Sequence, residues 1–256
     1  MTKLHSETLG QGKPIVLVHG WAMHSGVWRD FARALAQHYQ VTCIDLPGHG
    51  RSDKISPFTL EQISAALASS LPEQPCCWLG WSLGATVVLD IAERFPERVN
   101  SLILLAGNPL FVQAETWPGM DARLLGMFAD GLGKNCQATL SRFLALQVSG
   151  LADYKVLLKE LKESVFERDA PDTLILQGGL DILTQSDLRP AMSRLKCPVS
   201  AILGGKDMLI PVSVGKQLLQ LNAGCEVNIL DKAGHVPFLS HQQEVLTIIS
   251  RFLVQG

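Results

Sequence analysis

The stretch Gly80-Trp81-Ser82-Leu83-Gly84 decides how the rest of the chain is interpreted, because it has the pattern G-x-S-x-G. An apolar run at residues 76–79 precedes it, and a second apolar run at 85–92 follows it. This order predicts a buried strand, a sharp turn and a helix, the context in which the serine becomes an exposed nucleophile. Glycine is expected on both sides because a Cβ there would crowd the turn. The alternative, a chance match in an ordinary strand–helix turn, does not require those glycines.

Length and composition exclude several classes of protein. The 256 residues suit one α/β domain with an insertion, and 47% hydrophobic residues support a large core. A formal charge of −2 argues against a general nucleic-acid binder, and the chain has neither a signal-peptide core nor an apolar stretch long enough for a membrane span. The six cysteines lack metal-ligand spacing. We therefore expect reduced thiols in a cytoplasmic protein without metal or cofactor.

Outward from the serine motif, strands alternate with helices. Apolar runs predict strands at residues 3–9, at an edge, and at 15–18, 41–44, 101–105, 198–203 and 226–230, with helices near 27–38, 60–71, 212–221 and 242–254. The β-branched run at 15–18 is typical of a strand buried on both faces of a mainly parallel sheet. From about 110 to 187 helical periodicity replaces this alternation. The sequence predicts a mainly parallel α/β sheet flanked by helices, with a core of residues 1–109 and 188–256 and a helical cap of residues 110–187 inserted after about the sixth strand.

A serine hydroxyl is a poor nucleophile at neutral pH, so it needs a base, and the base needs a carboxylate that orients it. His235 lies just past the last predicted strand, where a loop can reach Ser82, whereas His241 near the closing helix is expected at the surface. Asp207 and Asp181 each follow a glycine pair after an apolar run. We favour Asp207, because it follows the strand beyond the cap, whereas Asp181 lies at the cap's exit.

Two backbone amides are expected to stabilise an oxyanion. The N–H of Leu83 opens the helix after the nucleophile, where the helix dipole is positive. The N–H of Trp21, in the loop after an early strand, is the second candidate, which leaves the indole free to line the substrate site. His19 and His49 are alternatives as the base, but we expect them to fix loop backbone through hydrogen bonds.

These stretches together resemble one superfamily. His19-Gly20-Trp21, Asp45-Leu46-Pro47-Gly48-His49-Gly50-Arg51-Ser52, the serine motif, Asp207 and Gly234-His235 resemble the α/β-hydrolase superfamily over the whole chain. More narrowly, the chain resembles the pimeloyl-[acyl-carrier protein] methyl ester esterase family of biotin synthesis. The closer resemblance rests on residues 78–84, on Arg142-Phe143-Leu144-Ala145-Leu146-Gln147, and on Gly178-Gly179-Leu180-Asp181-Ile182-Leu183 followed by Asp187-Leu188-Arg189.

The resemblance implies a serine carboxylesterase that removes the methyl group of a pimeloyl-[acyl-carrier protein] methyl ester and frees a carboxylate. The triad would be Ser82, His235 and Asp207, acting through an acyl-enzyme. Four further residues are expected at the oxyanion and substrate site, namely Trp21, Leu83, Trp81 and Phe143.

The family also implies an acyl carrier protein as partner, docked by basic cap residues, here Arg142, Lys155 and Lys159. Ala138 stands where the family pattern can carry another arginine, which would weaken the docking surface or shift it towards Lys134 or Lys162. The residues themselves give weaker support: Lys155, Lys159 and Lys162 fall on one helix face, but glutamates are interleaved, as on a solvated surface.

Two other interpretations remain open at this point. A broad-specificity small-ester carboxylesterase, or a carbon–carbon hydrolase, would use the same residues. A hydrolase-fold binding protein with a vestigial triad would need none of them for chemistry. We expect the protein to be a monomer.

Overall fold

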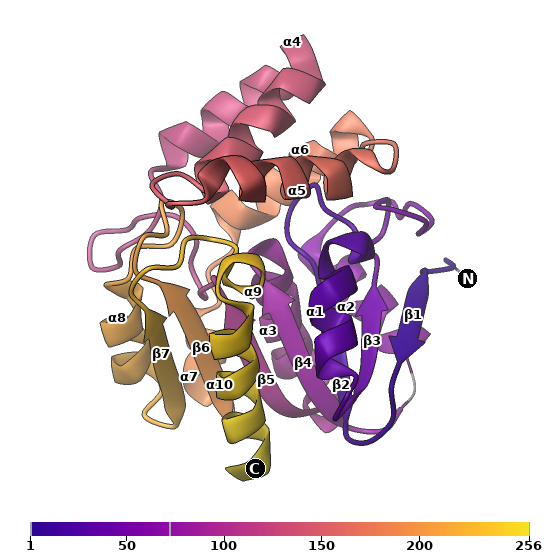
Figure 1. Cartoon of the computed structure of the whole chain (residues 1–256), viewed down its shortest axis with the longest axis vertical. Helices are drawn as coiled ribbons and strands as arrows, with labels where there is room; N and C mark the ends of the chain where they lie inside the picture. The colour runs from indigo at the N-terminus through magenta and orange to yellow at the C-terminus, as the bar shows by residue number, and fades with distance from the viewer. Residues whose placement is uncertain (1, 72, 256) are drawn as a thin grey trace.

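The computed structural model describes residues 2–71 and 73–255, and its strands form one seven-stranded sheet (Figure 1). The order across the sheet is β1-β3-β2-β4-β5-β6-β7. The strands are β1 (Ser6–Leu9), β2 (Pro14–Val18), β3 (Gln40–Ile44), β4 (Cys76–Trp81), β5 (Val99–Leu105), β6 (Val199–Gly204) and β7 (Cys225–Leu230). Only the edge strand β1 runs antiparallel to its neighbour among the strand pairs described. The predicted mainly parallel sheet is confirmed.

The central strands are apolar on both faces because helices cover both sides of the sheet. Successive residues alternate between two core clusters: Trp78 of β4 and Leu102 of β5 belong to one, Leu79 and Ile103 to the other. The first cluster packs against α2 (Leu60–Ser70), α3 (Leu83–Arg94), α7 (Arg189–Arg194) and α8 (Val214–Leu221). The second packs against α1 (Arg29–Leu35) and α10 (Gln242–Gln255), which lie in front of the sheet in Figure 1 with the short α9 (Pro237–Ser240).

The helix predicted at 27–38 is shorter than expected. It begins as a 3-10 turn, η1 (Ser25–Trp28), and α1 ends at Leu35 before the chain turns into β3. The predicted apolar stripe of Val27, Phe31 and Leu35 is nevertheless buried. A second 3-10 turn, η2 (Pro96–Arg98), follows α3, where proline ends the helix.

The helical segment lies over one end of the sheet and follows β5, the fifth strand, so the expectation of about six preceding strands is wrong (Figure 1). Its main helices are α4 (Ala122–Gln147), α5 (Tyr154–Phe166) and α6 (Thr173–Gln185). α4 is two helices joined at Asn135, which has non-helical angles of φ −158° and ψ 91°. The Asn135 Oδ1 accepts the N–H of Ala138 at 2.9 Å, so the asparagine caps the second half. Among the described residues no helix is both long enough and apolar enough to span a membrane.

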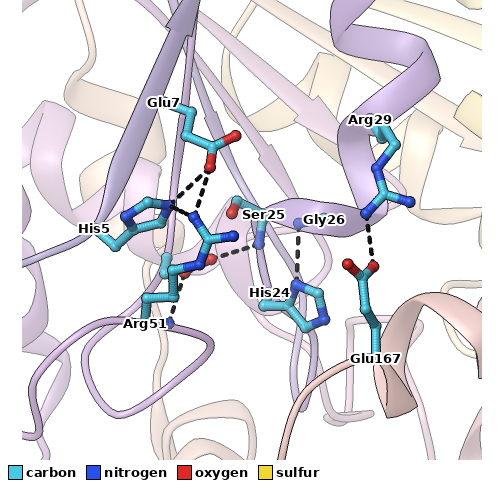
Figure 2. Close-up of polar contacts among 9 residues, drawn as sticks. His5, Glu7, His24, Ser25, Gly26, Arg29, Arg51 and Glu167 are labelled. Atoms are coloured by element: carbon cyan, nitrogen blue, oxygen red, sulfur yellow. Dashed lines mark hydrogen bonds and ion pairs between the residues drawn. The ribbon is translucent and has the colours of Figure 1, made fainter.

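Polar contacts fasten the end of α5 to the loop after β2 (Figure 2). The His24 Nε2–H donates to the Ser164 carbonyl at 2.6 Å. Its Nδ1 accepts the N–H of Gly26 at 3.1 Å, the bond drawn in Figure 2. Arg29 pairs with Glu167 at 2.6 Å. Because Nδ1 accepts a hydrogen bond, the ring of His24 is neutral, and burial lowers the pKa of His24 accordingly. These contacts line a polar cavity of about 190 Å³ whose walls include neither the motif serine nor His235.

Candidate active site

Ser82 occupies the sharp turn between β4 and α3 at φ 55° and ψ −117°. A positive φ is uncommon for a residue with a Cβ and persists only where the surroundings enforce it. A Cβ on Gly80 would collide with the carbonyl of Gly84, and a Cβ on Gly84 would collide with the carbonyl of Val18. The two glycines of the motif are therefore required by this close approach of backbones.

Ser82, His235 and Asp207 form a continuous hydrogen-bonded chain. The Ser82 hydroxyl lies 2.9 Å from His235 Nε2, and His235 Nδ1 lies 2.8 Å from Asp207 Oδ2. A carboxylate only accepts, so Nδ1 carries the ring proton and Nε2 is left to accept the serine hydrogen. The other oxygen of Asp207 accepts two backbone N–H groups, from Leu209 at 2.8 Å and Ile210 at 3.0 Å. These bonds hold the carboxylate in one orientation.

Neighbouring parallel strands bring the acid and the base together. Asp207 follows β6 and His235 follows β7, and the Lys206 N–H donates to the Ala233 carbonyl at 2.9 Å across the two loops. Asp181 lies instead within α6, where it is exposed and accepts a hydrogen bond from Gln177 at 3.0 Å. His241 is half-buried at the end of α9. The structure thus brings Asp207, and not Asp181, to His235.

The loop that carries Trp21 lies against the serine turn. A Cβ on Gly20 would lie 3.3 Å from the Cβ of Ser82. Within the described chain, the backbone N–H groups of Trp21 and Leu83 donate to no protein acceptor. Two adjacent free donors beside a nucleophile suit a developing oxyanion.

The three aromatic residues predicted at the site take different positions. The Trp21 indole is buried, and its N–H donates to the Leu176 carbonyl of α6 at 2.8 Å. The ring packs edge-on against Phe143 of α4, with 4.7 Å between the ring centroids. Trp81 instead donates its indole N–H to the His235 carbonyl at 2.7 Å. Trp21 and Phe143 therefore join the sheet end to the cap, whereas Trp81 supports the loop of the histidine.

His19 and His49 make the backbone contacts expected of them. The His19 Nδ1–H donates to the Gly20 carbonyl at 2.9 Å, and its Nε2 accepts the Leu46 N–H at 3.0 Å. His49 Nδ1–H donates to the Pro47 carbonyl at 3.0 Å. Burial lowers the pKa of His19 to about 3 and that of His49 to about 4, so both rings are neutral at physiological pH.

The basic residues predicted to dock a carrier lie on the exposed surfaces of α4 and α5. Arg142 on α4 and Lys155 on α5 are exposed, and Lys159 forms only a long, exposed pair with Glu163 at 3.7 Å. Exposed pairs of this kind are weak, so Lys159 is available to another acidic group.

Two buried side-chain amides near the site were given no role from the sequence. Asn108 follows β5, and Gln147 ends α4; in the described chain neither amide group has a hydrogen-bond partner. Gln147 closes the quoted stretch from Arg142 and lies one helical turn after Phe143, so its place on the same helix face follows from the sequence. Asn108 lies outside every sequence motif described above.

Comparisons with known proteins agree with this architecture. The profile of a family described as alpha/beta hydrolase fold matches residues 13–242. Among solved structures, an esterase from Exiguobacterium antarcticum superposes with a TM-score of 0.88 at 20% identity, covering 98% of this chain and 96% of that one. An enol-lactonase from Burkholderia xenovorans LB400 has a TM-score of 0.83 at 22% identity, covering 99% and 97%. These structures share the fold, and fold and site together define the class as an α/β hydrolase.

Curated relatives give a narrower assignment. A protein of Methylococcus capsulatus named pimeloyl-[acyl-carrier protein] methyl ester esterase is 41% identical over 253 residues, covering 99% of each chain. A protein of the same name from Shewanella sp. is 39% identical, covering 99% of this chain and 95% of its own. Another from Nitrosomonas europaea is 38% identical, covering 96% of this chain and 98% of its own. The chain belongs to this esterase family within the α/β hydrolases.

Proposed function

We propose that this chain is a serine carboxylesterase that hydrolyses the methyl ester of pimeloyl-[acyl-carrier protein] to pimeloyl-[acyl-carrier protein] and methanol in biotin synthesis. Relatives that bear this activity as their name match nearly the whole chain at up to 41% identity. The observation that carries the chemistry is the bond from Ser82 to His235, at 2.9 Å, continued to Asp207 at 2.8 Å.

In the proposed mechanism Ser82 Oγ attacks the ester carbonyl while His235 Nε2 accepts its proton. The amides of Trp21 and Leu83 bind the oxyanion of the tetrahedral intermediate. His235 then protonates the departing methoxide, leaving an acyl-enzyme. A water molecule gives its proton to His235 and attacks the acyl carbon. The bond from that carbon to Ser82 Oγ then breaks, His235 returns the proton to Oγ, and the product leaves with a free carboxyl group. Asp207 keeps His235 in the productive tautomer and stabilises its cation.

The reactive ester lies at the far end of the acyl chain from the carrier, so the acyl chain must extend beneath the helices while the carrier stays outside. We assign the cap to residues 110–187 and the core to residues 1–109 and 188–256. Trp21, Leu83, Trp81 and Phe143 are proposed to form the substrate and oxyanion site, with the amides of Trp21 and Leu83 as the oxyanion donors. Arg142, Lys155 and Lys159 are proposed to dock the acidic carrier, supported by their exposure on α4 and α5.

We further propose that the protein acts as a cytoplasmic monomer. Its six cysteines are free, and burial raises the pKa of Cys43, Cys76 and Cys77 to about 12. Thiols kept protonated in the core suit a reducing compartment.

The test is to measure methyl ester cleavage on carrier-bound acyl chains of several lengths and on short free methyl esters. We expect a higher kcat/KM for the carrier-bound pimeloyl ester. Equal or better cleavage of short free esters would favour a broad-specificity small-ester carboxylesterase instead. Failure of a phosphonate ester to label Ser82, together with absent turnover, would favour a binding protein.

A further inference from the structure

Trp81 is the last residue of β4 and directly precedes the nucleophile Ser82. Its side chain is buried, and its indole N–H donates to the backbone carbonyl of His235 at 2.7 Å. An indole has this one N–H and no acceptor. Because the His235 carbonyl occupies that N–H, the polar group of Trp81 acts on the catalytic base and is not available to a substrate.

The backbone and ring of His235 are hydrogen-bonded at every polar atom. The ring nitrogens bond to Ser82 and Asp207, and the backbone N–H donates to the Gln147 carbonyl at 3.2 Å. Any residue type at position 147 would supply that carbonyl. Within the described chain, the Trp81 N–H is therefore the bond to His235 that depends on a side chain outside the triad.

Packing holds the Trp81 ring in one place. The ring of Phe238, three residues after His235, lies 4.9 Å from it, and the ring of Trp28 lies 6.0 Å from it, both edge-on and measured between centroids. A Cβ on Gly20 would lie 3.2 Å from Cε3 of Trp81, so the indole also lies against the loop after β2. An indole packed on several sides is a rigid support for the carbonyl that it binds.

The proposed reaction requires His235 Nε2 to reach Ser82 Oγ, then the leaving oxygen, then the attacking water. His235 lies in the loop after β7, so a shift of this loop would move Nε2 relative to all three atoms. Misplacing a reacting group by about 1 Å can cost about 10²-fold in rate. Trp81 and Ser82 are consecutive residues, so the N–H that supports the base is attached to the backbone that carries the nucleophile.

We infer that Trp81 is a positioning residue for the catalytic base: its indole N–H fixes the His235 carbonyl relative to the end of β4, and so keeps Nε2 within reach of Ser82. In this role Trp81 transfers no proton and contacts no reacting atom. The inference rests on the proposed serine mechanism and holds for any ester that the enzyme cleaves.

Trp28 provides a matched control. It lies in the same aromatic cluster and is fully buried, but its indole N–H has no acceptor in the part of the chain that the structure describes. Trp28→Phe and Trp81→Phe remove the same atoms from neighbouring rings. Of the two, Trp81→Phe alone breaks a hydrogen bond to the loop of His235.

The test compares Trp81→Phe, Trp28→Phe and wild type on p-nitrophenyl butyrate by stopped flow, with rates expressed per site titrated by a p-nitrophenyl phosphonate ester. Both acylation and deacylation need proton transfer through His235, so both maximal rates should fall about tenfold or more in Trp81→Phe. The substrate concentration at half the maximal burst rate should stay within about twofold, because no substrate contact is lost. Trp28→Phe should keep both rates close to wild type.

Trp81→His and Trp81→Leu separate the hydrogen bond from ring volume. Histidine and leucine have similar volumes, and Nε2 of histidine is as many bonds from Cα as Nε1 of tryptophan. Trp81→His can therefore restore a ring N–H to the His235 carbonyl and should keep a higher acylation rate than Trp81→Leu. This pair carries the test if Trp81→Phe does not fold.

Rates of Trp81→Phe close to wild type would overturn the inference. So would equal slowing in Trp28→Phe, which would indicate packing, or equal rates in Trp81→His and Trp81→Leu. A raised half-saturation concentration at an unchanged maximal rate would show that Trp81 contacts substrate instead. A wild-type enzyme that cleaves p-nitrophenyl butyrate but not the carrier-bound methyl ester would contradict the proposed substrate and leave the comparison of the two tryptophans intact.

Discussion

The carboxyl end of the sheet and the helices above it are built under different constraints. At the sheet end Ser82, His235 and Asp207 are almost completely buried, and glycines permit backbones to touch. On the cap, apolar side chains such as Met127 of α4 and Val156 of α5 are about two-thirds exposed, at 69% and 67%. Few sequences satisfy the first set of constraints, and many amphipathic helices satisfy the second. The comparison teaches that close backbone approaches constrain the sequence around the serine turn more tightly than the exposed surfaces of α4 and α5.

α6 lies where the two regions meet. Like the serine turn, it has glycines at positions where a Cβ would collide with a neighbour. A Cβ on Gly179 would lie 2.6 Å from the Trp21 indole, and a Cβ on Gly178 would lie 2.6 Å from the ring of Phe58. The glycine pair that made Asp181 resemble Asp207 in the sequence is therefore a packing feature. It lets α6 approach the loop that carries Trp21.

The comparison is tested most strongly at the nucleophile. Ser82→Ala should lower kcat by about 10⁶, because a nucleophile and its base act as a unit. Its Tm should stay close to wild type, since alanine keeps the Cβ and the flanking glycines remain. The check is steady-state hydrolysis of a short ester together with thermal unfolding. Activity within tenfold of wild type would rule out an acyl-enzyme on this serine.

The acid gives the next largest effect and a matched control. Asp207→Asn should lower kcat by about 10⁴, because the amide favours the wrong tautomer of His235. Asp181→Asn, the same change on an exposed carboxylate of α6, should leave kcat within a few-fold. Both are measured on the same short ester. A larger loss of kcat for Asp181→Asn would show that the catalytic acid lies on α6. The difference between the two regions described above would then be wrong.

The buried His49 side chain predicts that the free energy of unfolding depends on pH. The folded pKa of His49, about 4, lies below its unfolded value near 6.5, so the unfolded chain binds the proton first. Stability from this group is full above pH 6.5 and decreases as pH falls towards 4, by about 2 kcal/mol at pH 5. His49→Asn should therefore lose less stability than wild type between pH 7.5 and 5 in urea unfolding. Parallel curves for the two proteins over that range would show that His49 is solvated.

The smallest effect is expected on the cap. Arg142→Glu combined with Lys159→Glu should raise KM for the carrier-bound ester about tenfold or more and spare a small soluble ester. The wild-type preference for the carrier-bound substrate should also shrink as salt rises, because exposed charges are screened beyond roughly 8–10 Å. An equal loss on both substrates would indicate a disturbed cap. No loss on either would move the docking surface towards Lys134 or Lys162.

The sequence by itself determined the order of strands and helices, the α/β-hydrolase fold and the serine turn. Each depends on short-range patterns: apolar runs bounded by turn residues, and glycines where a Cβ does not fit. The same local reasoning preferred Asp207 to Asp181 from their places after a strand and before a helix. Its count of about six strands before the helical segment was wrong, because the predicted strands before residue 110 are the same five that the structure has there.

Only the tertiary structure decided which side chains meet. Ser82 and His235 are 153 positions apart in the chain, and they approach because parallel strands end at one edge of the sheet. The partner of the Trp21 indole, the support of the His235 loop by Trp81 and the unpaired amide of Gln147 likewise arise from contacts between distant elements. Such contacts depend on how α4 and α6 pack against the sheet. Local sequence patterns do not determine which residues of two distant elements lie opposite each other.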